Sequence, residues 1–447
     1  MTKRSSVIGS ALAVLLSTVF IATLPAAPQD AAGSSRSPRE TGLAAPVGEE
    51  WRRQGLATFD AVWRTVHETY FDPAFGGLDW QAVRDQLRPK VLAARSPDEQ
   101  RAVIREMLRR LGQSHFALLS RTDDGALRGP ALPPIEVRVA DGQLFVVRVT
   151  SRALDVRPGD RIVAIDNRPV DELLARIDPD DPRRAEMAWR AAMRELSGLS
   201  GSMVHLDLVA PDGTERRTPA VRVVPPGEMV TVGNLPSIRA HLVREERRTG
   251  DGRRIGIIRF NVWMTAIAEP FAQAIDAFRD ADGLVIDLRG NPGGLAEMIR
   301  GIAGHLIDEA VPIGYLRMRD LELEFIVNPR RSTSDGRAVR PYAGPVAVLV
   351  DELTASASEC FAAGLQALGR ARVFGRRTAG QALPASTQQL LNGDVLLYAV
   401  GDFSTPDGRR LEGRGVEPDV EVSLDPAQLA AGRDAETAAI EWLLSLQ

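Results

Sequence analysis

The sequence predicts an α/β core preceded by a helical region, with a strand-rich module inserted between them. From about residue 227 onward, short apolar runs that suit buried strands alternate with amphipathic stretches that suit helices. Apolar residues recur at helical spacing within residues 49–130, and strand-like runs separated by turn sequences fill residues 131–226. A βαβ alternation favours a largely parallel sheet covered by helices, so the class is α+β overall with an α/β core.

Composition limits the possible functions. The 447 residues are 44% hydrophobic and 26% charged, as in a soluble chain of two or three domains. The formal net charge is −4 and arginines are scattered among acids, so nucleic acid is not expected as a partner. The single cysteine, Cys360, cannot form an internal disulfide, and we expect it to be a buried structural residue. The sequence has no H-E-x-x-H and no clustered histidines, so we expect no metal and no other cofactor.

The N-terminus has the order of an export signal. Lys3 and Arg4 precede an apolar stretch over residues 7–24 and then small residues and prolines. We therefore expect a signal peptide over residues 1–27, with cleavage near Ala26, and a flexible tether over residues 28–48. The protein would then be periplasmic or extracellular. An uncleaved segment, anchored in the membrane and facing outward, is the alternative.

The helical region over residues 49–130 ends in the stretch LRRLGQSHFALL. In the module over residues 131–226, the pattern P-G-D-x-I-x-x-I-x-x-x-x-V resembles a PDZ domain, with a short helix starting near Asp171. The segment from Asp178 to Arg194 is interpreted as a long, charged loop. PDZ-like modules bind extended chain ends by strand addition, which suggests a peptide partner.

The core over residues 227–447 contains two turns that suit catalysis. The first, DLRGNPGG (287–294), follows the strand GLVIDL and precedes a helix. Glycines at a strand end let backbone amides approach a ligand atom, which suits an oxyanion hole. The alternative is a tight strand-to-helix turn with Pro292 near the first helical position.

The second turn, TASASE (354–359), follows the strand VAVLV. Ser356 and Glu359 have the spacing of a capping box, which would need no catalysis. A serine at a helix start can also be a nucleophile, and the backbone amide of Ala357 could then join Gly293 or Gly294 in binding an oxyanion. Ser358 is the next candidate for the nucleophile.

Together the two turns resemble the C-terminal processing (tail-specific) serine peptidases. Further matches are Tyr70-Phe-Asp-Pro with Asp79-Trp, IGIIRFNVW (255–263) and EGRGVEPDV (412–420). The resemblance implies a ClpP/crotonase-like βαβ core and a peptide or unfolded protein as substrate, with its C-terminus as a possible recognition element. It also implies Ser356 as nucleophile, and Gly293 or Gly294 with Ala357 as oxyanion donors.

The general base departs from that pattern. Bacterial processing peptidases have T-x-G-K with a catalytic lysine, whereas this chain has Gln381 at that position, and a glutamine amide cannot serve as a base. The chain has only two lysines. Lys3 belongs to the expected signal peptide, and we expect Lys90 to be solvated. The element G-x-Ser114-His115 is similar to the tricorn protease core, a branch of the same superfamily. That similarity implies His115 as base.

The same similarity implies that Glu412 orients His115. We expect Ser114 to polarise the oxyanion or to fix the site, and Asp419 and Glu417 are the alternatives to Glu412. Four other histidines are expected to be structural: His67, His205, His241 and His305. The competing hypothesis is a non-catalytic peptide- or lipophile-binding protein, because relatives of the interphotoreceptor retinoid-binding protein use the same core for ligand carriage.

Overall fold

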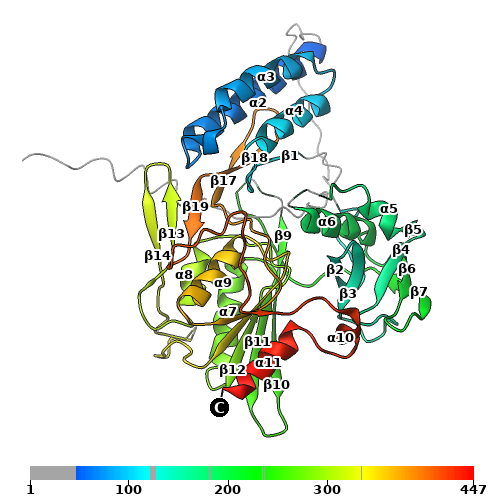
Figure 1. Ribbon diagram of the computed structural model, residues 1–447, viewed down its shortest axis with the longest axis vertical. Coiled ribbons are helices and arrows are strands. Elements are labelled where there is room, and N and C mark those ends of the chain that lie inside the picture. The colour runs from blue at the N-terminus through cyan, green and yellow to red at the C-terminus, as the bar shows by residue number, and fades with distance from the viewer. Residues whose placement is uncertain are drawn as a thin grey trace, which may run out of the picture.

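The computed structural model describes residues 47–120, 127–179, 181, 183–233, 235, 237–333 and 335–446. Figure 1 shows a helical unit at one end, a strand-rich unit on one side, and a central sheet flanked by helices. The predicted mixed α/β class is confirmed. The expected signal peptide and nearly all of the expected tether lie outside the described residues. Within the described part of the chain, no helix is both long enough and apolar enough to span a membrane.

The helical unit packs on strands from the far end of the chain. Asp79 and Ser96 cap two of its helices by accepting hydrogen bonds from Ala82 N and Glu99 N. Strand β1 pairs with β18, so that Ala117 lies opposite Leu397. This pairing fixes the segment after the helices, which carries His115, against the core. The elements are α2 (Val47–Thr69), η2 (Phe75–Gly77), α3 (Trp80–Ala93), α4 (Pro97–Arg109), β1 (Ala117–Leu119), β17 (Ala385–Gln389) and β18 (Val395–Ala399).

The strand-rich unit contains a sheet in the order β2-β3-β4-β6-β7, with β5 paired to β4. The segment predicted as a loop from Asp178 to Arg194 instead contains a helix, so that prediction is wrong. Ala188, Ala192 and Leu196 recur at helical spacing and are buried in the core of this unit, which explains the helix. The elements are β2 (Ile135–Ala140), β3 (Gln143–Val149), β4 (Arg161–Ile165), β5 (Arg168–Pro169), α5 (Val170–Leu174), α6 (Arg184–Leu196), β6 (Met203–Val209) and β7 (Glu215–Val221).

The central sheet has the order β10-β11-β12-β15-β16-β20 and is parallel from β11 to β20. Its strands are apolar on both faces: α7, α8 and α9 cover one face and α11 covers the other. The elements are β10 (Leu242–Arg248), β11 (Arg254–Phe260), η3 (Thr265–Ile267), α7 (Ala268–Ala277), β12 (Gly283–Asp287), α8 (Met298–Ala303), β15 (Val346–Val350), α9 (Ala357–Ala367), β16 (Arg372–Gly375), β20 (Val420–Glu421), α10 (Pro426–Ala430) and α11 (Ala435–Ser445).

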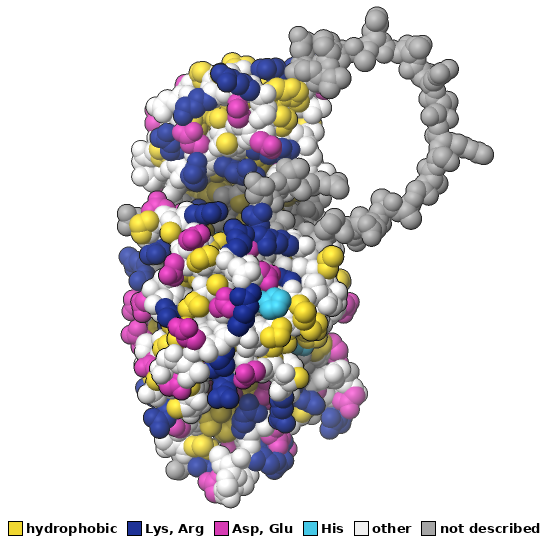
Figure 2. Space-filling model, turned by 90° about the vertical axis from the view of Figure 1, so that its right-hand side faces the viewer, with side chains coloured by type: hydrophobic (Ala, Val, Ile, Leu, Met, Phe, Trp, Pro, Cys, Tyr) yellow, Lys and Arg dark blue, Asp and Glu magenta, His cyan; other side chains and the backbone are white. Residues whose placement is uncertain are grey.

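The sheet topology brings the two predicted catalytic turns together. Strands β12 and β15 are parallel neighbours, and each turn follows the carboxyl end of its strand. Neighbouring carboxyl ends of a parallel sheet form the usual binding edge of such folds. Two smaller sheets also occur, one of β14 (Glu322–Ile326), β13 (Pro312–Met318) and β19 (Gly401–Ser404), the other of β8 (Glu228–Val230) and β9 (Ile238–Ala240). On the face in Figure 2, acidic and basic side chains are interspersed.

Candidate active site

Ser356 lies at a sharp turn between β15 and α9. Its φ of 61° and ψ of −121° are strained for a residue with a side chain, and strain of this kind is frequent at nucleophile turns. The residue is fully buried, and its Oγ has no hydrogen-bond partner among the described residues. Ser356 and Glu359 occupy capping-box positions, and Glu359 Oε2 accepts from Ser356 N at 2.9 Å. The Ser356 hydroxyl, however, meets no donor at hydrogen-bonding geometry and stays available for chemistry.

Glu359 joins the nucleophile turn to the segment that carries Gln381. Besides Ser356 N, its buried carboxylate accepts from Gly380 N at 2.8 Å, from Gln381 N at 2.9 Å and from Thr378 Oγ1. Burial raises the pKa of Glu359 to about 7, while these hydrogen bonds act in the opposite direction. The carboxylate therefore holds residues 378–381 against the turn that contains Ser356.

The glycine turn after β12 lies directly against Ser356. A Cβ on Gly293 would come within 2.7 Å of Ser356 Cβ, and its φ is +97°, so this position requires glycine. Gly293 N already donates to Asn291 Oδ1 at 3.0 Å. Among the described residues, Gly294 N and Ala357 N have no acceptor. Of the two glycine amides predicted as oxyanion donors, the structure thus leaves that of Gly294 free.

Glu412, Ser114 and His115 form a hydrogen-bonded row. Ser114 Oγ lies 2.7 Å from His115 Nδ1 and 2.9 Å from Glu412 Oε2, and Ser114 N donates to Glu412 Oε1 at 2.7 Å. Because an ionised carboxylate can only accept, the Ser114 hydroxyl donates to Glu412 and accepts from the N–H of His115 Nδ1. This assignment leaves Nε2 of His115 with its lone pair, as a general base needs. Ser114 is therefore placed between Glu412 and the imidazole, and Glu412 orients the ring through it.

The surroundings favour the same charge states. His115 keeps some solvent exposure, yet burial lowers its pKa to about 4, with the Glu186 carboxylate acting in the opposite direction. Burial raises the pKa of Glu412, and hydrogen bonds from Ser114 and from Ala382 N at 2.9 Å oppose that effect. Near neutral pH the imidazole is therefore uncharged and ready to accept a proton.

The predicted nucleophile and the predicted base are linked through two consecutive residues. Gln381 N donates to Glu359, which also accepts from Ser356 N. Ala382 N donates to Glu412, which contacts His115 through Ser114. Ser356 Oγ and His115 are not hydrogen-bonded to each other in this conformation. Catalytic hydrogen bonds are often long without substrate and shorten when substrate binds.

The chain matches known proteins along most of its length. Residues 254–422 match peptidase family S41, and residues 50–109 match the tricorn protease C1 domain. The chain is 26% identical over 383 residues to carboxyl-terminal-processing peptidase 3, chloroplastic, of Arabidopsis thaliana, covering 82% of this chain and 68% of that protein.

A further relative and a solved structure also resemble this chain. A putative tricorn protease homolog 2 of Streptomyces coelicolor is 26% identical over 412 residues, which is 86% of this chain but only 31% of that longer protein. The solved structure of the photosystem II D1 C-terminal processing protease has the same fold, with a TM-score of 0.53 and 23% identity, over 83% of this chain and 94% of that one. The chain is thus a serine-type peptidase, as predicted, and a non-catalytic binding protein is not favoured.

The alternative candidates for the nucleophile and for the orienting carboxylate make structural contacts. Ser358 Oγ accepts from Trp263 Nε1 at 2.8 Å, inside the core. Asp419 accepts from Val373 N at 2.7 Å, at the edge of the sheet, and Glu417 is exposed. None of these contacts lies in the row of hydrogen bonds that reaches His115.

The remaining predicted structural residues lie away from that row as well. Lys90 Nζ pairs with Glu106 Oε1 at 3.1 Å on the surface. His67 stacks on Trp63 with ring centroids 4.8 Å apart, His305 is buried in the core, and the lone cysteine is buried in α9. The other two histidines are His205 in β6 and His241 between β9 and β10. In the described part of the chain, no group of three or more His, Cys, Asp or Glu residues could hold a metal ion.

Sequence reasoning missed a charged contact beneath the two turns. The Asp351 carboxylate accepts from Gly290 N at 2.8 Å in the glycine turn and from Leu353 N at 3.1 Å in the nucleophile turn. Arg138 Nε, on β2 of the strand-rich unit, donates to the other oxygen of Asp351 at 2.6 Å. Only 8% of the Arg138 side chain and 4% of the Asp351 side chain are exposed. The available signal was the acidic residue that ends the apolar strand 346–350.

Proposed function

We propose that this S41 peptidase cleaves peptide bonds through an acyl-enzyme on Ser356, with His115 as general base. One observation carries the proposal: the row from Glu412 through Ser114 fixes the imidazole in the tautomer that accepts a proton. The unpartnered, buried hydroxyl of Ser356 supplies the matching nucleophile. A Ser–Lys mechanism is not available at this position, because Gln381 replaces the lysine.

The chemical steps follow from these positions. Ser356 Oγ attacks the scissile carbonyl while its proton moves to His115 Nε2. Gly294 N–H and Ala357 N–H stabilise the oxyanion of the tetrahedral intermediate. The imidazolium then protonates the leaving amine, which departs and leaves an ester on Ser356. Water, deprotonated by the same imidazole, hydrolyses that ester and restores the enzyme.

Covalent labelling with a fluorophosphonate probe tests the proposal directly. The wild-type protein should be labelled on the peptide that contains Ser356, whereas Ser356→Ala should not be labelled and His115→Ala should lose nearly all labelling. Ser358→Ala is the matched control, because Ser358 lies two positions away and bonds to Trp263. Undiminished labelling of Ser356→Ala would place the nucleophile elsewhere. Undiminished labelling of His115→Ala would refute the assigned base.

We propose further that the strand-rich unit receives the substrate as an extended chain end. Its P-G-D motif and its sheet with a short helix after β5 support a PDZ-like role, and β7 forms an edge strand that can pair with a peptide. The names of the carboxyl-terminal-processing relatives support recognition of a C-terminus. Cleavage of paired peptides that differ in a free or amidated C-terminus tests this, and equal kcat/KM for both would contradict it.

We also propose that the protein works outside the cytoplasm. The basic residues, apolar stretch and small residues at the N-terminus support export, with a signal peptide over residues 1–27. Cell fractionation with mass measurement of the mature N-terminus tests this. A full-length protein in the cytoplasmic fraction would contradict export, and an intact N-terminus in the membrane fraction would indicate an anchor.

A further inference from the structure

Helix α6 brings an acidic side chain from the strand-rich unit to the peptidase site. Gln381 Nε2 donates to Glu186 Oε2 at 3.0 Å, which joins α6 to the segment that bonds to Glu359 and Glu412. Arg190, one helical turn further, holds Glu186 Oε1 through Nη2 at 2.6 Å. The Glu186 side chain is 19% exposed, so this contact is largely shielded from water.

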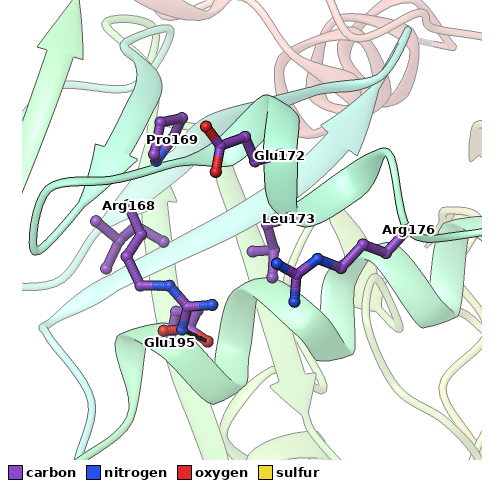
Figure 3. A pocket seen from close by; sticks show the side chains of 7 residues that line it. Arg168, Pro169, Glu172, Leu173, Arg176 and Glu195 are labelled. Atoms are coloured by element: carbon purple, nitrogen blue, oxygen red, sulfur yellow. Dashed lines mark hydrogen bonds and ion pairs between the residues drawn. The ribbon is translucent and has the colours of Figure 1, made fainter.

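The opposite end of α6 is firmly held, so the helix can position Glu186. Glu195 is buried and accepts from Arg128 at 2.8 Å and from Arg168 at 2.6 Å. Figure 3 shows Arg168 reaching Glu195 beside a small cavity between α5 and α6. The apolar face of α6 packs into the core of the strand-rich unit. The acidic side chain is thus carried on a supported helix and not on a mobile loop.

The base has one carboxylate that acts on it through a relay. Glu412 contacts the Ser114 hydroxyl, and that hydroxyl contacts His115. Arg410 and Tyr70 both lie near enough to Glu412 to interact with it electrostatically. A positive charge that forms on the imidazole is therefore balanced on this side by a carboxylate one side chain away.

A second carboxylate, on α6, lies near enough to the base to interact with it electrostatically. Glu186 acts electrostatically on His115 and opposes the effect of burial on its pKa. Arg190, on the same helix, partly offsets the Glu186 charge through its ion pair. The Glu359 carboxylate accepts hydrogen bonds from four donors, one of which is Gln381 N. Gln381 binds Glu186 and the next residue, Ala382, binds Glu412, so both carboxylates are attached to consecutive residues at the site.

We propose that Glu186 is a positioning residue for the general base. Its carboxylate, held by Gln381, stabilises the imidazolium that forms when His115 Nε2 takes the Ser356 proton. Gln381 then has a role of its own, because its neutral amide holds a carboxylate that a lysine would neutralise. This inference rests on the proposed function, since it requires His115 to be the base.

The test is the rate of fluorophosphonate inactivation measured against pH, which reads the base without peptide recognition. Glu186→Gln keeps the shape and removes the charge, so we expect the rate at pH 7 to fall about three- to tenfold. Removing a negative charge lowers the pKa of His115, so the acidic limb of the profile should move to lower pH. Arg190→Gln removes a positive charge and should move it to higher pH, while Glu186→Asp should retain most of the rate.

Glu172→Gln is the matched control, since Glu172 is an exposed acid on α5. This variant should leave unchanged both the inactivation rate at pH 7 and the position of the acidic limb of the pH profile. An unchanged rate and limb in Glu186→Gln, with labelling lost in His115→Ala, would overturn this inference alone. A slower rate with an unmoved limb would also overturn it, because it would show that Glu186 only docks α6. Retained labelling in His115→Ala would instead overturn the proposed base itself.

Discussion

Replacing Ser114 by alanine removes the hydroxyl that connects Glu412 to His115. Two hydrogen bonds are lost, of 2.7 Å to His115 Nδ1 and 2.9 Å to Glu412 Oε2. The backbone bond from residue 114 to Glu412, at 2.7 Å, and the bond from Ala382 N remain, so the carboxylate should keep its place. The change therefore acts on the tautomer and charge of the imidazole more than on the fold.

The magnitude follows from these contacts. A hydrogen bond that involves a charged group contributes about 1.5–3 kcal/mol. Each 1.4 kcal/mol corresponds to about tenfold in rate. Because the relay serves the imidazolium that forms during attack, we expect kcat to fall about 10- to 150-fold with little change in KM.

The assay is steady-state cleavage of a fluorogenic peptide by Ser114→Ala, with fluorophosphonate inactivation as a second measure. Ser445→Ala is the control, because the Ser445 hydroxyl bonds to its own helix, on the surface. Thermal unfolding should be close to that of the wild type for both variants. A kcat for Ser114→Ala within about twofold of the wild type would refute the relay.

Three further changes test other parts of the structure. Gly293→Ala places a methyl group 2.7 Å from Ser356 Cβ at a φ of +97°. We expect fluorophosphonate labelling to fall about 100-fold, and wild-type labelling would contradict the close approach. Arg138→Met leaves the buried Asp351 without its ion-pair partner and should lower the free energy of unfolding by about 3–5 kcal/mol in urea titrations, a smaller loss than about 1 kcal/mol arguing against the contact. Burial lowers the pKa of His305 to about 4, below its unfolded value of 6.5, so the unfolded chain binds more protons between these values and stability falls as the pH drops through that window. Between pH 7 and pH 5, His305→Leu should lose about 2 kcal/mol less stability than the wild type, and equal losses would refute the assignment.

Features made within a few residues were predictable from the sequence. The nucleophile turn and the glycine turn are contiguous motifs at strand ends, and parallel neighbours place such ends side by side. The sequence T-x-D-G-R forms the same turn at Thr249, Thr333 and Thr405, where the arginine amide donates to the threonine Oγ1 at 3.1, 2.9 and 3.0 Å. Such contacts recur because the donor and the acceptor lie only four residues apart in the chain and need no distant partner.

Helix α6 was missed for a local reason. The stretch from Asp178 to Arg194 is charged, and its buried face consists of small alanines, which give a weak apolar signal. A loop would not fix the position of Glu186, whereas the helix carries it to Gln381. Helical spacing of Ala188, Ala192 and Leu196 was the signal that could have located the helix.

The sequence by itself determined the residue types of the site: a serine at a strand-to-helix turn, glycines at the neighbouring turn, and a histidine in place of a lysine. Only the tertiary structure decided how they act. It placed Ser114 between Glu412 and His115, across 298 positions of the chain, and left the Ser356 hydroxyl uncapped. In the structure, the amide of Gly293 also donates a hydrogen bond to Asn291 Oδ1 in the same turn. The physical reason is that hydrogen-bond partners distant in sequence are chosen by the packing of three units around one sheet edge, which no local pattern records.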